Sequence, residues 1–278
     1  MPKSVKYLVK RILIFLELWK YGKLIPSFPS VRVNPKSFKI GGSWLNNGNA
    51  YDSTIIRILF EILQCLVEKK DLNVNLIDIG ASTGTFSLLP VFDKRINVFA
   101  FEPNSSVFEL LTNNVKINNI TENCTLFNYA LSDKEGEMEL IIPKQSGLAT
   151  LSDSPLRFKK SKIKIIQTVK VFTLDKIWKD NYGKVDFIKI DTEGWEHFVL
   201  KGAQETIKKY RPYILMEFEE ENIRQCGLTK EIIISFIKKL NYQIYYIRED
   251  ILCFPNPVDK IVYLTFKIFC KDYVQFLE

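Results

Sequence analysis

The chain has 278 residues, of which 46% are hydrophobic and 26% are charged, proportions that exclude an extensively disordered protein. Its net charge of +7 is confined to the start of the chain: residues 1–40 contain nine Lys or Arg and one acidic residue, whereas residues 41–278 contain 30 basic and 31 acidic residues. A nucleic-acid enzyme is expected to carry a basic face on its catalytic domain. The charge distribution therefore argues against nucleic acid as a partner.

The cysteines are odd in number, lie far apart and include no C-x-x-C pair. This spacing argues against a disulfide framework or a zinc site and favours reduced thiols in a cytoplasmic protein. The cysteines are Cys65, Cys124, Cys226, Cys253 and Cys270.

The N-terminal segment has an amphipathic pattern. In the range Ser4–Lys20, apolar residues recur at helical spacing with lysines and arginines between them, so we expect a helix. Its longest uncharged run, Ile12–Leu16, is too short to cross a bilayer, and no signal-peptide cleavage site follows it. This helix either packs on the domain with its lysines in solvent or lies in a membrane interface through residues 1–20. Residues 22–50 are rich in Gly, Pro, Ser and Asn and are expected to form a linker or an irregular covering loop.

We divide the chain into residues 1–50, which hold the basic helix and the linker, and residues 51–278, a single α/β domain. In this domain, short apolar runs alternate with stretches whose apolar residues have helical spacing. Such alternation predicts a parallel sheet with helices in right-handed crossovers. The expected helices are 52–70, one from Thr85, 105–118, 195–210 and 229–240, and the expected strands are 72–79, 97–101, 124–128, 185–190, 213–218, 242–248 and 261–269.

Two parts of the domain depart from this alternation. Between residues 131 and 172, turn residues and short apolar runs predict a β insertion with strands at 138–142 and 165–172. The basic run 159–164 is either a solvated strand edge or a loop for a polar or phosphorylated substrate. The last two strands have no helix between them, which predicts an antiparallel pair that closes the sheet.

A glycine-rich turn follows the first predicted strand. The strand ends near Asp78, and Gly80 and Gly84 follow in the pattern D-x-G-x-x-x-G. Glycines adopt backbone angles closed to other residues and leave room for a ligand, and we expect the next helix to present free N–H groups to that ligand. Glu102, 18 residues after Gly84, ends the next strand, where its carboxylate can hold two ribose hydroxyls. The pattern predicts a nucleotide-binding turn.

The acidic residue at the strand end distinguishes between two nucleotide cofactors. An NAD site packs its glycines around a pyrophosphate, which the carboxylate of Asp78 would repel. The same carboxylate suits a cationic ligand with an amino-acid tail, such as the sulfonium of S-adenosylmethionine. We therefore predict S-adenosylmethionine as the cofactor. For the turn considered alone, any doubly wound α/β protein is the alternative.

Further short motifs stand in order along the domain: Asp78-Ile79-Gly80-Ala81, Phe101-Glu102-Pro103-Asn104, Ala130-Leu131-Ser132-Asp133, Thr173-Leu174-Asp175, Ile188 to Glu196 and Val199 to Ala203. With these motifs, the chain resembles the FkbM-type S-adenosylmethionine-dependent O-methyltransferases over about residues 74–240. The resemblance implies a class I methyltransferase fold, which is Rossmann-like and doubly wound, with seven strands and the last one antiparallel. It also implies methyl transfer to a hydroxyl, often on a sugar or polyketide.

The resemblance implies roles for individual residues as well. It places Glu102, with Pro103 beside it, at the ribose of the cofactor, and Asp191 where the methyl group meets the acceptor. This chain has Ser82-Thr83-Gly84 where the family commonly has Asn-x-Gly, a change that keeps a hydrogen-bonding side chain. The other implied cofactor contacts are Asp78, Gly80, Ala81, Ser82 and Gly84 at the methionine portion, and Tyr129, Ala130 and Leu131 at the adenine.

A base is expected to remove the proton of the acceptor hydroxyl. The candidates follow two neighbouring strands: Asp191, Glu193, Glu196 and His197 after one, and Glu217 and Glu219 after the next. His197 is the only histidine, and its ordinary pKa suits base chemistry near neutral pH, with a structural role as the alternative. We predict Asp191, Glu193 and His197 as the catalytic residues. Asp191, Glu193 and a neighbouring carboxylate would also suit Mg²⁺, but we predict no metal.

Together these patterns predict a cytoplasmic S-adenosylmethionine-dependent O-methyltransferase that acts on a hydroxyl of a sugar, glycan or glycolipid precursor. The N-terminal helix is a candidate for peripheral contact with the inner face of a membrane. The alternative acceptor is a polyketide-type or other small-molecule hydroxyl. A non-catalytic, membrane-docked nucleotide-binding protein would keep the glycines but would need none of the acidic residues.

Overall fold

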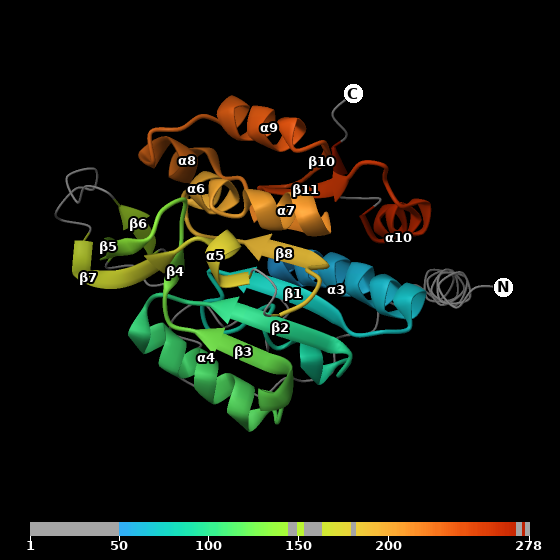
Figure 1. Cartoon of the computed structure of the whole chain (residues 1–278), viewed down its shortest axis with the longest axis horizontal. Coiled ribbons are helices and arrows are strands. Elements are labelled where there is room, and N and C mark those ends of the chain that lie inside the picture. Colours follow the sequence, from blue (N-terminus) through green and yellow to red (C-terminus); the bar gives the residue numbers. More distant parts are fainter. Residues whose placement is uncertain (1–49, 144–148, 153–162, 179–181, 271–273, 276–278) are drawn as a thin grey trace.

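The computed structural model describes residues 50–143, 149–152, 163–178, 182–270 and 274–275, and a mixed sheet forms its centre (Figure 1). Its strands are β1 Val74–Ile79, β2 Ile96–Phe101, β3 Cys124–Phe127, β8 Phe187–Ile190, β9 Tyr213–Glu217, β10 Tyr242–Ile247, β11 Asp250–Pro255 and β12 Val274–Gln275. The strand order is β12-β10-β11-β9-β8-β1-β2-β3. Strands from β9 to β3 are parallel, whereas β11 is antiparallel to both β9 and β10. This order confirms the doubly wound seven-stranded fold with an antiparallel last strand, and β12 adds a short strand at one edge.

Helices cover both faces of the sheet. They are α3 Ala50–Lys70, α4 Ser105–Ile117, α5 Leu174–Trp178, α6 Glu196–Lys201, α7 Gln204–Tyr210, α8 Glu220–Gln225, α9 Lys230–Lys239 and α10 Lys260–Cys270. Leu76 of β1 packs in the core that contains α3, α4 and α10, whereas Ile77 packs in the core that contains α5 to α9. Because neighbouring side chains of a strand point to opposite faces, a central strand covered on both sides needs a nearly continuous apolar run.

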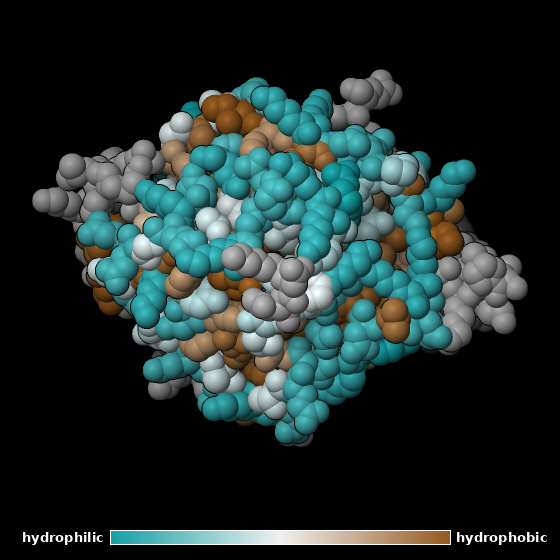
Figure 2. All heavy atoms as spheres, in the orientation of Figure 1, coloured by the Kyte–Doolittle hydropathy of each residue, from teal (hydrophilic) through white to brown (hydrophobic). Residues whose placement is uncertain are grey.

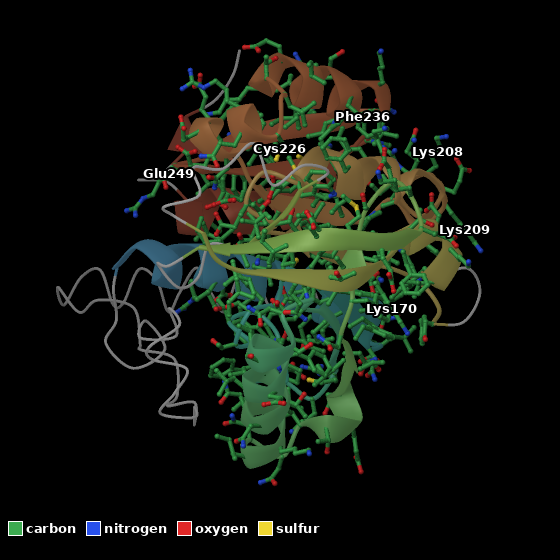
Figure 3. All side chains as sticks on the ribbon, turned by 90° about the vertical axis from the view of Figure 1, so that its left-hand side faces the viewer. Lys170, Lys208, Lys209, Cys226, Phe236 and Glu249 are labelled. Carbon is green, nitrogen blue, oxygen red and sulfur yellow. The ribbon has the colours of Figure 1, made fainter. Side chains whose placement is uncertain are left out.

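A smaller sheet lies beyond the carboxyl ends of the parallel strands, at the left in Figure 1 and facing the viewer in Figure 3. Its strands are β4 Ala130–Leu131, β5 Gly136–Pro143, β6 Thr150–Ser152 and β7 Ile163–Phe172, in the order β4-β7-β5-β6. β5 is antiparallel to β6 and β7, and β4 is parallel to β7. The sheet confirms the predicted β insertion. Most of the basic run 159–164 lies outside the described residues.

The prediction of a strand at residues 261–269 was wrong. These residues belong to the helix α10, and the antiparallel strand that closes the core of the sheet, between β9 and β10, is β11. The segment is rich in β-branched and aromatic residues, which favours a strand by composition. Val262 and Phe266, one helical turn apart, are nevertheless fully buried in the core that α10 shares with α3. Helix packing on the face of the sheet therefore outweighs strand propensity here.

Two predicted helices also differ from the structure. No α-helix begins at Thr85. Residues 82–88 form turns that lead into the short 3₁₀ helix η2, Leu89–Val91. Pro90 explains the difference, since it lacks the N–H that a continuous helix needs and its ring clashes with the preceding turn. The predicted helix 195–210 is divided into α6 and α7 around Gly202, where a Cβ would lie 1.9 Å from the carbonyl oxygen of Ser132.

The predictions for the N-terminal segment concern residues outside the described ranges. They include the amphipathic helix 4–20, its membrane contact and the linker as far as residue 49. In the part of the chain that the structure describes, no helix has both the length and the apolar character needed to cross a membrane. The face shown in Figure 2 is largely hydrophilic, and its hydrophobic side chains lie in separate patches.

Candidate active site

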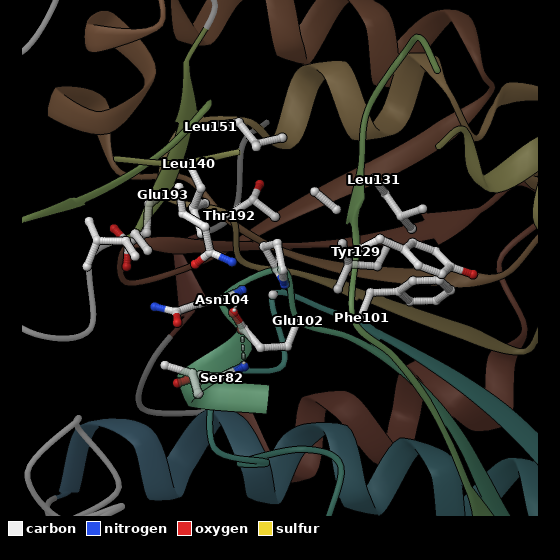
Figure 4. A pocket seen from close by; sticks show the side chains of 18 of the residues that line it. Ser82, Phe101, Glu102, Asn104, Tyr129, Leu131, Leu140, Leu151, Thr192 and Glu193 are labelled. Atoms are coloured by element: carbon white, nitrogen blue, oxygen red, sulfur yellow. Dashed lines mark hydrogen bonds between the residues drawn. The ribbon is translucent and has the colours of Figure 1, made fainter. Parts of the chain in front are cut away.

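A cavity of about 370 Å³, here called the first cavity, lies where the carboxyl ends of β1, β2 and β8 meet the smaller sheet (Figure 4). Ligands of open α/β sheets bind at this edge. The structure brings to its wall the predicted residues Gly80, Ser82, Glu102, Pro103, Tyr129, Ala130, Leu131, Asp191 and Glu193. The predicted residues Asp78, Ala81, Gly84 and His197 do not line it.

Glu102 is held at the end of β2 by two backbone N–H groups. Its Oε2 accepts a hydrogen bond from the Ser82 N–H (2.9 Å) and its Oε1 accepts one from the Asn104 N–H (2.8 Å), as Figure 4 shows for Ser82. Burial raises the pKa of Glu102 to about 7, against the opposite effect of these hydrogen bonds and of Lys189. Each carboxylate oxygen keeps a lone pair for another donor. One side chain can therefore hold two hydroxyl groups at the cavity wall.

Gly80 lets the backbones after β1 and β8 approach each other beside the cavity. Its φ is +73°, and a Cβ at this position would lie 1.8 Å from the carbonyl oxygen of Asp191. Only glycine combines this left-handed conformation with so close an approach. Ser82, whose φ is +50°, continues the turn and donates its N–H to Glu102. The turn therefore fixes Glu102 and Asp191 relative to each other.

A buried lysine links the two aspartates predicted at the site. The Nζ atom of Lys189 lies 3.0 Å from Asp191 Oδ2 and 3.8 Å from Asp78 Oδ1. It also lies 4.9 Å from the ring centroid of Phe86. Asp78 Oδ2 accepts a hydrogen bond from Ser87 Oγ (2.6 Å). Burial raises the pKa of Asp78, while Lys189 and Ser87 lower it.

Asp78 is thus placed behind the cavity wall and not beside a ligand, because its side chain is fully buried and faces Lys189. Lys189 was not among the predicted site residues. The sequence does contain a signal for it, because Lys189 is the one charged residue of the otherwise apolar strand β8. A lysine buried in such a strand requires a charged partner nearby. The geometry makes Lys189 the counter-ion that holds Asp191 at the cavity.

Replacing Lys189 with methionine is expected to destabilise the fold more at pH 8 than at pH 5. Without the ammonium group, the pKa of Asp78 in the folded protein rises further. A carboxyl group whose pKa is higher in the folded than in the unfolded protein destabilises the fold as the pH rises from the lower to the higher of these two values. Loss of one partner of a buried ion pair typically costs about 3–5 kcal/mol. Thermal unfolding at both pH values measures this cost. The control Lys184→Met removes a lysine whose side chain is 58% exposed and should change Tm little. If Lys189→Met loses the same free energy of unfolding at both pH values, the role of Asp78 would be contradicted.

Three carboxyl groups meet where β8 and β9 end. Oxygen atoms of Asp191, Glu193 and Glu217 all lie within 4.8 Å of one another. Asn222 Nδ2 donates to Glu193 Oε2 (2.8 Å) and Glu217 Oε2 (3.5 Å). Burial and then the neighbouring carboxylates raise the pKa of Glu193 to about 8 and that of Glu217 still further. The protonated forms of both glutamates are therefore favoured near neutral pH. The oxygen atoms of the cluster would also suit a divalent cation.

Two other candidate bases serve the local backbone. Glu196 Oε1 accepts hydrogen bonds from the Thr192 N–H (2.8 Å), the Thr192 hydroxyl (2.9 Å) and the Gly194 N–H (3.2 Å). Glu219 caps α8 by accepting a hydrogen bond from the Asn222 N–H (3.0 Å). Neither side chain lines the first cavity. Their carboxylates are therefore used to order the loops after β8 and β9.

His197, predicted as a catalytic residue, is placed in an aromatic environment away from the cavity wall. Its ring lies edge-on to Phe236 and Phe198, with centroid distances of 5.2 and 5.9 Å. Burial, followed by Lys201, lowers the pKa of His197. The side chain is turned toward the packing between α6 and α9, so we do not retain it as the base.

The remaining wall of the first cavity is apolar. The rings of Phe101 and Tyr129 lie beside Glu102 with their centroids 5.7 Å apart (Figure 4). Leu140 and Leu151 reach the cavity from β5 and β6 of the smaller sheet. Aromatic and aliphatic surfaces of this kind suit a flat heterocyclic ring. The two leucines were not predicted as site residues, because no sequence pattern indicates which strand of the insertion folds over the site.

Comparison with known proteins agrees with the fold and the motifs. The family model described as "Methyltransferase FkbM domain" matches residues 78–244. The hexuronic acid methyltransferase AglP of Haloferax volcanii is 25% identical over 158 residues, which are 56% of this chain and 61% of that protein. The match thus spans less than two thirds of this relative.

Solved structures give further matches. The methyltransferase FkbM from Methylobacillus flagellatus KT aligns with a TM-score of 0.46 at 16% identity, covering 78% of this chain and 60% of that one. The precorrin-6y C5,15-methyltransferase from Geobacter metallireducens GS-15 aligns with a TM-score of 0.42 at 10% identity, covering 82% and 97%. The family model covers more than half of the chain, including the turn at Gly80, Glu102 and the segment around Asp191. The chain therefore belongs to the FkbM family of methyltransferases.

Proposed function

We propose that the protein transfers a methyl group from S-adenosylmethionine to a hydroxyl group of a sugar, glycan or glycolipid precursor. The observation that carries this proposal is the buried carboxylate of Glu102, which two backbone N–H groups hold at the wall of the first cavity. The acceptor class is supported by the family and by a relative whose name describes methylation of a hexuronic acid.

The residues around the first cavity fit the parts of this cofactor. Glu102 can accept hydrogen bonds from both ribose hydroxyls, and the rings of Phe101 and Tyr129 offer a flat apolar surface to the adenine. The turn at Gly80 and the carboxylate of Asp191 offer oxygen atoms to the cationic methionine end. When bound, S-adenosylmethionine supplies a methyl group carried on a positively charged sulfur.

Asp191 is the residue that we assign as the base. It lines the cavity, and Lys189 holds its carboxylate at 3.0 Å. Burial and the neighbouring carboxylates raise the pKa of Glu193 and of Glu217 and so favour their protonated forms. Asp191 is the member of the cluster that pairs with the ammonium group of Lys189. A base within hydrogen-bond reach contributes typically ~10²–10⁴ in rate, and orientation of the hydroxyl by the cavity contributes the rest.

Calorimetric titration with S-adenosylmethionine and, separately, with NAD tests the cofactor assignment. Wild type is expected to bind S-adenosylmethionine and not NAD. Glu102→Ala should weaken this binding by roughly 10- to 100-fold, as expected for the loss of a charged hydrogen-bond acceptor. Glu122→Ala, which removes an exposed glutamate outside the first cavity, is the matched control. Binding of NAD instead, or equal affinities in both variants, would contradict the assignment.

Affinity for S-adenosylmethionine is also expected to depend on pH. The ribose hydroxyls need an ionised Glu102, whose pKa is about 7 in the free protein, so affinity should fall by up to about tenfold for each pH unit below 7. Above that pH the contribution of Glu102 should be constant. Titrations from pH 5.5 to 8.5 measure this dependence, and Glu102→Gln should remove it. A wild-type profile that parallels the Glu102→Gln profile would show that this carboxylate does not hold the ligand.

A further inference from the structure

We infer that the acceptor carries an aliphatic group beside its sugar ring, and that the smaller sheet holds this group next to Asp191. This inference rests on the proposed function, because it names the class of acceptor used at the same site. It concerns the part of the first cavity wall that is formed by Leu140 and Ile142 of β5, Leu151 of β6 and Ile165 of β7, here called the apolar strip.

The apolar strip belongs to one face of the smaller sheet. Leu140 lies opposite Leu151 across β5 and β6, and Ile142 lies opposite Ile165 across β5 and β7. Residues directly opposite each other share a face of the sheet, as do residues two apart on one strand, such as Leu140 and Ile142. The four aliphatic side chains therefore present one apolar surface to the first cavity.

A polar side chain on the same face, Gln167, is turned toward α4. It lies opposite Leu140, and its Nε2 donates a hydrogen bond to Ser105 Oγ (3.1 Å) at the first residue of that helix. Sugar hydroxyls that leave water need hydrogen-bond partners, and the aliphatic side chains of the strip provide none. A sugar ring against these side chains would leave hydroxyls unpaired, whereas an aliphatic group removes apolar surface from water there.

One end of the apolar strip lies beside the loop that carries the base. Thr150, the residue before Leu151, donates a hydrogen bond from its Oγ1 to the carbonyl oxygen of Thr192 (3.3 Å). Thr192 directly follows Asp191, and both residues line the first cavity. Figure 4 shows Leu151 on the same side of the cavity as Thr192, away from the rings assigned to the adenine. An aliphatic group at this end of the strip is therefore close to the carboxylate assigned as the base.

The other end of the apolar strip opens to solvent. Leu140 and Leu151 are 1% and 5% exposed, whereas Ile165 is 49% exposed. Single exposed apolar side chains are common on protein surfaces, but this isoleucine lines the cavity and continues a buried apolar surface. The strip therefore offers a path for a chain that starts at the buried leucines and leaves the cavity past Ile165, as in a glycoside with an alkyl aglycone.

A series of alkyl glycosides tests the inference. The methyl, butyl, hexyl and octyl glycosides of glucose, galactose and mannose, each below its critical micelle concentration, are incubated with the full chain and S-adenosylmethionine carrying a labelled methyl group. For each sugar that is methylated, we expect KM to fall roughly two- to fourfold for every methylene that the strip covers, with kcat little changed. Equal KM values for the methyl and octyl glycosides, or methylation of none of the glycosides, would overturn the inference.

A polar substitution at the open end gives a second test. Ile165→Thr keeps a side chain that is branched at Cβ and suits a strand, but it places a hydroxyl on the apolar strip. It should raise the KM of the octyl glycosides by roughly three- to tenfold, because less apolar surface is buried on binding. The KM of the methyl glycosides and the affinity for S-adenosylmethionine should not change.

Ile232→Thr is the matched control. This isoleucine of α9 is 45% exposed and lines neither the first cavity nor a second, smaller one of about 150 Å³ beside Lys189 and Glu217. The control should leave every KM unchanged. Equal KM values of the octyl glycosides in the two variants would overturn the inference. A lower affinity of Ile165→Thr for S-adenosylmethionine would also overturn it, because the strip would then belong to the cofactor.

The calorimetric titrations separate the two kinds of failure. If binding of S-adenosylmethionine is absent or does not depend on Glu102, the proposed function fails. If that binding is intact and the length of the alkyl group has no effect on KM, only the inference about the acceptor fails.

Discussion

Replacing Asp191 with asparagine is expected to lower kcat for methyl transfer by ~10²–10⁴-fold, the usual contribution of a general base. The amide has nearly the same shape and can still accept the hydrogen bond from Lys189 Nζ, which lies 3.0 Å from the aspartate. It cannot accept the proton of the acceptor hydroxyl. The KM for the acceptor and the calorimetric affinity for S-adenosylmethionine should therefore change much less than kcat. Single-turnover transfer of a labelled methyl group measures the chemical step directly.

Two further variants identify the base. Glu193→Gln removes a carboxyl that holds its proton near neutral pH and should reduce kcat far less than Asp191→Asn. His197→Phe places a ring of similar size against Phe236 and should leave transfer intact. If kcat falls as far in Glu193→Gln or in His197→Phe as it does in Asp191→Asn, the residue replaced in that variant would be a better candidate for the base than Asp191.

Gly80→Ala is expected to be the most damaging small substitution on the turn. The added methyl group would lie 1.8 Å from the carbonyl oxygen of Asp191, in a conformation with φ of +73°. Left-handed strain and overpacking together should cost about 2–5 kcal/mol of the free energy of unfolding. Because relief of the clash moves Asp191, kcat should also fall, by ~10²-fold for a displacement of the order of an ångström.

Gly227→Ala is the matched control for this variant. Gly227 has φ of +74°, but among the described residues, apart from its two chain neighbours, no heavy atom lies within 4 Å of a Cβ built there. It should therefore show only the conformational cost of about 1–2 kcal/mol, with activity retained. Denaturant unfolding of both variants isolates the clash as the difference between them. Equal destabilisation would show that the approach of Asp191 to Gly80 has no energetic consequence.

The sequence predicted those parts of the site that lie at strand ends. Gly80, Glu102 and Asp191 each follow a buried apolar run, and parallel strands bring their carboxyl ends to one edge of a sheet. Alternation of strands and helices was therefore sufficient to place them together. The core sheet followed for the same reason, because apolar runs of this length are typical of strands buried on both faces.

The remaining features depend on which way a side chain points and on what covers it. Asp78 lies one residue before the end of β1, on the face that turns toward Lys189, so it is buried although its neighbours line the cavity. His197 lies in the first turn of α6, on the buried face of that helix, and its ring packs against Phe236. Composition at residues 261–269 favoured a strand, but contact with α3 selects a helix. Such choices are made by tertiary packing, which one sequence does not display.

A crystal structure of the full chain with S-adenosylhomocysteine tests the central claim most directly. We predict density in the first cavity, with the ribose hydroxyls within hydrogen-bond distance of Glu102, the adenine against Phe101 and Tyr129, and the sulfur facing Asp191. Density that places the ligand outside the first cavity, or that leaves Glu102 without a ribose contact, would contradict this assignment.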